Sequence, residues 1–356
     1  MPRLPATLTS APALALAAAA LFGASTPVAK RLLDDVSPML LAGLLYLGSG
    51  LGLSLATLVT RRTRSGGAGE AALRRRDWPW LAVAVGAGGV AAPVLLMEGL
   101  ARSGAASTAL LLNLEAAFTA LLAWSVFGEQ VGARVATGML AIVAGGAILA
   151  ATDRWSAADL AGPLCVAGAC LGWAIDNNAT RAVSGSDPLA IALVKGWIAG
   201  AVNLALAVGL GASMPRGGTL LGALALGAIA YGASLVLFVI ALRQIGSART
   251  GAYFSIAPFF GAAGAVAAFG EPVTPRLVAA GALMAVGVYL HLTERHDHDH
   301  AHEPLGHEHR HVHDEHHRHA HDGDAPAAEP HAHWHVHEAA SHGHPHYPDL
   351  HHRHRS

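Results

Sequence analysis

Two stretches of the chain decide the fold, because each is a version of the other. Residues 99–134 read "GLARSGAASTALLLNLEAAFTALLAWSVFGEQVGAR", and residues 241–276 read "ALRQIGSARTGAYFSIAPFFGAAGAVAAFGEPVTPR". Identical residues recur at an offset of 142, including Leu100 and Leu242, Gly104 and Gly246, and the "FGE" triplets at 127–129 and 269–271. A second offset, of 150, aligns Pro38 with Pro188. The chain therefore contains an internal repeat.

Ten apolar runs fill most of the chain before its last sixty or so residues. Each is close to the roughly 20 residues that a helix needs to cross a bilayer. The runs are continuous rather than alternating, which favours helices over a β-barrel. They lie near 12–31, 37–60, 78–99, 104–126, 132–151, 159–180, 188–210, 219–242, 247–269 and 275–293. The sequence thus predicts an all-α integral membrane protein with ten transmembrane helices.

The repeat divides these helices into two units of five, over residues 12–151 and 159–293. Because five is odd, the second unit must enter the membrane upside down. Inverted repeats place a binding site near the bilayer midplane, reached alternately from each side. This organisation predicts a carrier.

Basic residues predict the orientation of the bundle. With the N-terminus inside, inner segments before residue 295 carry eleven arginines and outer loops carry six Lys or Arg. Most of the difference comes from the loop at 61–77, "RRTRSGGAGEAALRRRD". The positive-inside rule then places both termini in the cytoplasm.

The small-residue helix after "GAAST", the "FGE" turn and the Gly-rich span after it occur in both halves. In these features residues 12–293 resemble the EamA family of the drug/metabolite transporter superfamily. The resemblance implies a bacterial-type inner-membrane carrier, an exporter of small metabolites with a central cavity between its repeats. Many members carry a proline after the mid-helix leucine in both copies. Here the second copy has Pro258, but the first has Glu115 and Ala116.

Glu115 lies midway along the fourth run, two residues after Asn113. A charge at the centre of a membrane helix costs about 2.5–3.5 kcal/mol on insertion scales, so it is expected to face protein or water. One interpretation makes Glu115 a cavity carboxylate that takes up a proton or contacts a cationic group of a substrate. The other makes it a protonated, hydrogen-bonded structural residue.

A second polar group follows Trp173, an aromatic residue at the expected cavity depth. Asp176, Asn177 and Asn178 lie near the inner end of the sixth run, and Lys195 lies at similar depth in the seventh. A pair between Asp176 and Lys195 would offset the cost of either charge alone. One interpretation makes the two residues a polar gate or substrate clamp. The other makes them a salt bridge that fixes the hairpin, or two side chains that snorkel to the inner interface.

Catalytic motifs are absent from the sequence: there is no GxSxG, no Walker phosphate loop and no HExxH. The chain is therefore not expected to be an enzyme or to require a cofactor. The acids of the "FGE" turns, Glu129 and Glu271, are expected to favour the N-terminus of the helix that follows each of them.

Residues 295–356 differ in composition from the rest of the chain and contain 22 of its 23 histidines. Neutral imidazole is a ligand for Zn, Ni, Co and Cu, and the tract lacks the apolar residues of a core. We expect a tail that is disordered without ligand and binds metal in a graded, unselective way. The candidate ligands are His296, His298, His300, His302, His307, His309, His311, His313, His316, His317, His319, His321, His331, His333, His335 and His337.

Three functions remain open from the sequence. The first is a secondary carrier that exports a small polar metabolite, with the tail as a metal-binding accessory. The second is a divalent-metal exporter, and the third is a membrane-tethered metal buffer or sensor. The expected partners are the lipid bilayer, a small-molecule substrate and divalent metals, with no nucleic acid, and a homodimer is compatible with the sequence.

Overall fold

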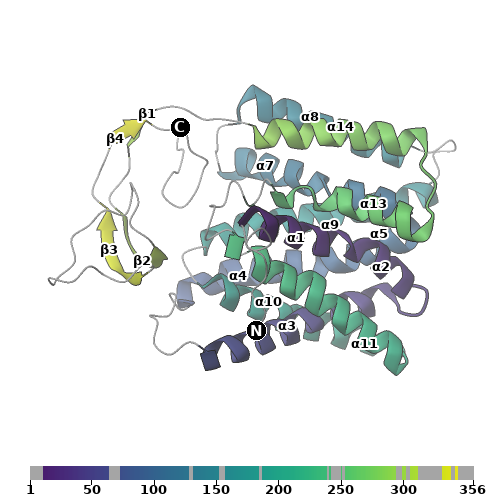
Figure 1. The fold of residues 1–356 in the computed structure, drawn as a ribbon, viewed down its shortest axis with the longest axis horizontal. Helices are drawn as coiled ribbons and strands as arrows, with labels where there is room; N and C mark the ends of the chain where they lie inside the picture. The colour runs from purple at the N-terminus through teal and green to yellow at the C-terminus, as the bar shows by residue number, and fades with distance from the viewer. Residues whose placement is uncertain are drawn as a thin grey trace.

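The computed structural model describes residues 11–63, 73–127, 131–151, 157–183, 187–238, 240–241, 250 and 253–293, and the tail segments 299–301, 305–311, 331–337 and 341–343. Up to residue 293 the elements in these ranges are all helices, lying side by side in a bundle (Figure 1). Within the described ranges, nine helices are long and apolar enough to cross a membrane. The ninth predicted run, only partly described, holds the shorter apolar helix α13 (Ala257–Phe269). The predicted all-α membrane fold is confirmed.

Several spans are built from more than one helical segment. The first half comprises α1 (Ala11–Gly23), α2 (Ser25–Leu32), α3 (Pro38–Thr63), η2 (Arg75–Asp77), α4 (Trp78–Ala84), η3 (Val85–Ala91), α5 (Ala92–Arg102), α6 (Ala105–Leu111), α7 (Leu114–Phe127) and α8 (Ala133–Ala150). The second half comprises α9 (Ala157–Ala182), α10 (Pro188–Gly209), α11 (Gly217–Leu226), η4 (Gly227–Ala233), α13 and α14 (Pro275–Leu292).

The offset of 142 residues recurs in the bounds of these elements. It relates both ends of α8 to those of α14, and both ends of η3 to those of η4. η3 and η4 are wide π-helical segments inside otherwise α-helical spans, a rare feature that each half has at the same position. Contacts follow the same pattern: α3 packs on α10 and η4, α10 also packs on η3, and α8 packs on α14.

Glycines let α3 approach its neighbours closely. A Cβ built on Gly48 would lie 2.3 Å from the carbonyl oxygen of Leu224, and one on Gly52 would lie 3.0 Å from the Cβ of Ala228. Small residues of this kind allow backbones to approach where lipid supplies no hydrophobic drive between helices. The GxxxG spacing in α3 therefore serves contact with α11 and η4.

The tail contains four short strands among its described residues. β1 (Asp299–Ala301) pairs with β4 (Ser341–Gly343), and β2 (Leu305–His311) pairs with β3 (His331–His337), both antiparallel. The sequence predicts a tail without regular structure, and these four short strands differ from that prediction. Their histidines alternate with other residues, and a period of two is the period of a pleated strand.

Candidate functional site

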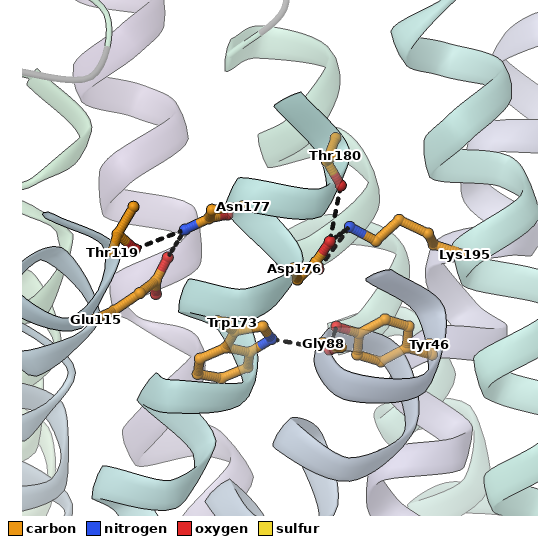
Figure 2. A network of polar contacts seen from close by, with 9 residues as sticks. All are labelled: Tyr46, Gly88, Glu115, Thr119, Trp173, Asp176, Asn177, Thr180 and Lys195. Carbon is orange, nitrogen blue, oxygen red and sulfur yellow. Dashed lines mark hydrogen bonds and ion pairs between the residues drawn. The ribbon is translucent and has the colours of Figure 1, made fainter. Parts of the chain in front are cut away.

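The site is organised around η3, whose sequence "VGAGGVA" is glycine-rich. A π-helical turn disturbs the regular backbone ladder, and in a membrane the affected carbonyls must find other donors. Tyr46 Oη and Trp173 Nε1 both donate to the Gly88 carbonyl, each at 3.0 Å (Figure 2). Asn203 Nδ2 donates to the next two carbonyls at 3.4 and 3.3 Å. Donors from α3, α9 and α10 therefore converge on η3.

Asp176 and Lys195 form a buried ion pair between α9 and α10. Lys195 Nζ lies 2.6 Å from both carboxylate oxygens, and Thr180 Oγ1 donates to Oδ1 at 2.8 Å. The Asp176 side chain is 6% exposed and that of Lys195 is 20% exposed. The pair expected from the sequence is thus present, with a hydroxyl completing it.

Gly88 makes room for this pair. A Cβ at Gly88 would lie 2.1 Å from Asp176 Oδ2 and 2.5 Å from its Cγ. Any side chain here would meet the carboxylate of a residue that Lys195 and Thr180 already hold in place. Gly88 therefore has two roles. Its carbonyl accepts two hydrogen bonds, and the absence of a Cβ leaves space for the Asp176 carboxylate.

Glu115 lies at the start of α7, just after the chain breaks its helix at Leu112 and Asn113. Backbone bonds of the tighter i to i+3 kind bridge this break, including Glu115 N to the Leu112 carbonyl at 3.1 Å. Glu115 Oε1 accepts from Asn177 Nδ2 at 2.9 Å, and the same amide lies 3.4 Å from Thr119 Oγ1. Glu115 as a residue is half-buried, and Asn177 is exposed.

The polar residues of α9 point to two sides of that helix. Figure 2 shows Asp176 and Thr180 on the side of Lys195, and Asn177 on the side of Glu115 and Thr119. Neighbouring positions on a helix face different directions, so α9 separates a charge-balanced pair from a lone carboxylate.

Two further predicted residues, Asn178 and Asn113, make hydrogen bonds to the backbone of the helices around the site. Asn178 is buried and donates to the carbonyls of Ala174 and Thr119, which ties α9 to α7. Asn113 is buried, but its amide donates to the Leu110 carbonyl at 2.9 Å and approaches Met284 Sδ at 3.9 Å. The structure thus does not join Asn113 to the Glu115 carboxylate.

The sequence interpretation missed five residues that build this site: Tyr46, Gly88, Thr119, Thr180 and Asn203. Two of them carried a usable signal, since Thr119 and Thr180 lie one helical turn after Glu115 and Asp176. The glycine cluster at 86–89 also marks an irregular turn inside an apolar run. Tyr46 offered no such signal, because a tyrosine in an apolar helix is more often a packing residue.

Among side chains that the structure describes, no group of three or more His, Cys, Asp or Glu is placed to hold a metal ion. Half of the predicted tail ligands lie in the described strands: His300, His307, His309, His311, His331, His333, His335 and His337. The other half lie outside the described residues: His296, His298, His302, His313, His316, His317, His319 and His321.

Comparison with known proteins identifies the family. The model of the EamA-like transporter family matches residues 9–151 and 160–293. A protein of Methanothermobacter thermautotrophicus named "Uncharacterized transporter" is 28% identical over 282 residues, covering 76% of this chain and 82% of that protein. A crystal structure of another protein superposes with a TM-score of 0.59 at 20% identity, over 78% of this chain and 95% of that one, and so shares the fold. The chain belongs to the EamA-like transporter family and is a multi-pass membrane transporter.

Proposed function

We propose that this transporter is a secondary-active carrier that exports a small polar metabolite by alternating access. Glu115 is the residue at which substrate or proton binds. The observation that carries the proposal is a half-buried acidic residue at the middle of a membrane span: Glu115 lies eleven residues into Ala105–Val126, a span of 22 residues. Ionisable groups at that depth mark substrate or proton pathways.

Glu115 differs from Asp176, the other acid of the network, in having no positive charge of the described residues paired with it. Lys195 balances Asp176, whereas Glu115 accepts its hydrogen bond from a neutral amide, Asn177. Among the described residues Glu115 has no ion-pair partner. A carboxylate so placed has capacity for one positive charge, which a proton or the cationic group of a substrate would supply.

The Asp176–Lys195 pair is proposed to work beside Glu115 as a polar clamp. Asp176 and Asn177 are consecutive in α9, so a movement of this helix shifts both sites together. Trp173, three residues earlier, anchors the same helix to η3 through its indole. Coupling between the two sites then needs no direct contact between their charges.

The tail is proposed to bind transition metals as an accessory to transport, with Zn, Ni, Co and Cu as the ions that imidazole prefers. Both termini are proposed to face the cytoplasm, in a bacterial-type inner membrane. An exporter of divalent metal is the competing function, and the tail is the feature that favours it.

The first experiment compares extracellular metabolites and metals of cells that express the wild type, Glu115→Gln or no transporter. We expect one or a few polar metabolites to accumulate outside with the wild type and not with Glu115→Gln. Glu98→Gln is the matched control, because it makes the same chemical change at an acid paired with Arg102 on α5. A metabolite profile that Glu115→Gln leaves unchanged would remove Glu115 from the mechanism.

Purified protein in liposomes then separates the alternatives. Substrate-driven proton movement, read with an enclosed pH-sensitive dye, is expected for the wild type and abolished in Glu115→Gln. Full pH-dependent transport by Glu115→Gln would contradict proton coupling. Flux of radioactive nickel or cobalt without any metabolite flux would instead establish the metal exporter.

A further inference from the structure

Aromatic rings from several spans form a continuous row inside the bundle. Their centroids lie 5.8 Å apart for Tyr46 and Tyr231, 5.5 Å for Tyr231 and Phe22, 5.5 Å for Phe22 and Phe254, and 5.1 Å for Phe254 and Phe238. Aromatic pairs prefer separations of about 4.5–7 Å. Phe22 belongs to α1, Tyr46 to α3, Tyr231 to η4 and Phe254 to the segment before α13. Side chains that face lipid from different spans point away from one another, so rings that meet in this way lie inside the bundle.

The row reaches the polar network at Tyr46. Its hydroxyl and the Trp173 indole both donate to the Gly88 carbonyl, and Figure 2 shows the two rings on either side of this residue. Tyr46 is close enough to Asp176 and Glu115 to interact with them electrostatically. Trp173 lies one helical turn before Asn177, the residue that donates to Glu115. The aromatic row and the Glu115 carboxylate are therefore neighbouring parts of one site.

The rings are not packed as tightly as the core. Tyr46, Tyr231 and Phe22 are each half-buried, and so is Glu115, whereas Leu41 in α3 is fully buried. Because the rings lie inside the bundle, their uncovered surface is available to a bound molecule rather than to lipid. Binding sites for small molecules typically combine apolar and aromatic walls with a few placed polar groups.

From this arrangement we infer that the transported metabolite is an organic cation that carries an aromatic ring and no carboxylate. Its ammonium group pairs with Glu115, and its ring lies against Tyr46 and Tyr231. The inference deepens the proposed function, and it rests on Glu115 being a residue that binds substrate.

Charge explains both parts of this description. Glu115 lacks an ion-pair partner among the described residues, so an ammonium group can balance it. The faces of Tyr and Trp rings also attract a cation within about 6 Å of their centroids. Lys195 is the basic residue of the network, and both oxygens of Asp176 hold its ammonium at 2.6 Å. A substrate carboxylate would have to compete with Asp176 for that charge.

The test is calorimetric titration of the purified full-length protein in detergent with three probes. The first, 2-phenylethylamine, has the cation and the ring. Butylamine lacks the ring, and phenylalanine adds a carboxylate to the first probe. We expect 2-phenylethylamine to bind more tightly than either of the others. Equal or tighter binding of phenylalanine would overturn the exclusion of a carboxylate.

Variants of Tyr231 test the ring. Tyr231→Leu is expected to weaken binding of 2-phenylethylamine about 2–10-fold, the contribution of one aromatic pair, and to leave butylamine unchanged. Tyr231→Phe keeps the ring and is expected to keep wild-type affinity. Tyr289→Leu is the matched control, because it makes the same change at a ring on α14 that is 61% exposed. Equal weakening of both amines by Tyr231→Leu would overturn the inference, since the ring would then not recognise a ring.

Glu115→Gln separates this inference from the proposed function. We expect it to abolish binding of both amines. If the wild type bound both amines equally and Glu115→Gln bound neither, the aromatic substrate would be refuted and the role of Glu115 would stand. If Glu115→Gln bound both amines like the wild type, Glu115 would not be the substrate residue, and both proposals would fail there. Absence of 2-phenylethylamine binding to the wild type would overturn the inference and leave Glu115 to the proton assay in liposomes.

Discussion

Asp176 and Lys195 bring opposite charges together inside the bundle, where either charge alone is costly. Removing one partner of a buried pair typically costs about 3–5 kcal/mol, because the other charge remains desolvated, whereas removing both costs much less. We therefore expect Lys195→Met and Asp176→Asn each to lower the free energy of unfolding strongly, and the double variant to recover a large part of the loss. Denaturant-induced unfolding in detergent measures all three.

A surface pair supplies the control for this cycle. Arg31 and Asp34 lie 3.2 Å apart with side chains 68% and 63% exposed. Asp34→Asn should change stability by only about 0–1 kcal/mol. If the double variant at Asp176 and Lys195 lost the sum of the two single losses, the two charges would not act as a pair.

Gly88 carries the second prediction at this scale. Gly88→Ala places a methyl group where the Asp176 carboxylate now lies, since the built Cβ is 2.1 Å from Oδ2. Overpacking costs about 1–3 kcal/mol, and a displaced carboxylate would also weaken its bond to Lys195. Gly86→Ala is the matched control in the same π-helical segment, because a Cβ there meets nothing within 4 Å. Thermal unfolding should show a clear loss for the first variant and little change for the second.

Whether the contact of a residue could be predicted depends on how far along the sequence its partner lies. The Asp176–Lys195 pair was predictable because the two residues lie 19 positions apart across one hairpin. The bond between Asn177 and Glu115 joins residues 62 positions apart in different halves. No local pattern encodes such a separation, so the sequence predicted both residues as polar but not their contact.

At the scale of elements, the corner between α5 and α6 is held from two sides. Lys30 Nζ donates to the carbonyls of Leu100, Ala101 and Ser103 at 2.5, 3.1 and 2.9 Å. The Glu271 carboxylate accepts from the amides of Ala105 and Ala106 at 2.7 and 2.9 Å. A cation thus meets the C-terminal end of α5 and an anion meets the N-terminal end of α6, as the dipoles of the two helices favour.

The Glu271 contact corrects an expectation drawn from the "FGE" turn. That acid was expected to favour the helix that follows it, but α14 is capped by Thr274, whose hydroxyl accepts from Leu277 N at 3.1 Å. Gly270, with φ of 65°, ends α13 in the left-handed conformation ahead of this turn. Glu271 instead caps a helix of the other half, a partner about 165 residues away that no helix-start rule can identify.

Substitution of Glu271 should therefore cost more than substitution of Thr274. Loss of a helix N-cap costs about 0.5–2 kcal/mol, while hydrogen bonds to a charged group contribute about 1.5–3 kcal/mol each. We expect the order of stability loss Glu271→Ala, then Glu271→Gln, then Thr274→Val, because glutamine keeps one accepting oxygen. Unfolding in detergent measures the order. A larger loss for Thr274→Val would show that the contact between the halves adds little.

At the scale of the whole molecule, bundle and tail are expected to act as separable parts. The buried apolar core is formed by residues of both halves of the bundle, such as Leu41, Leu100, Ile142 and Met284. A chain lacking residues 296–356 should therefore unfold at the same temperature as the full protein and keep metabolite export, while losing Co²⁺ binding. Lost export together with lost metal tolerance would tie the tail to transport itself.

The final prediction concerns the direction of the chain through the membrane. Ten crossings return a chain to its starting side, whereas nine would leave its ends on opposite sides. Reporter fusions before residue 11 and after residue 293 should therefore both report the cytoplasm. The loop at 61–77 contributes six of the eleven inner arginines, and their replacement leaves five basic residues inside against six outside. Because the excess of basic residues sets orientation, that variant should insert in both directions. Reporters that stay wholly cytoplasmic in the variant would show that another feature orients the bundle.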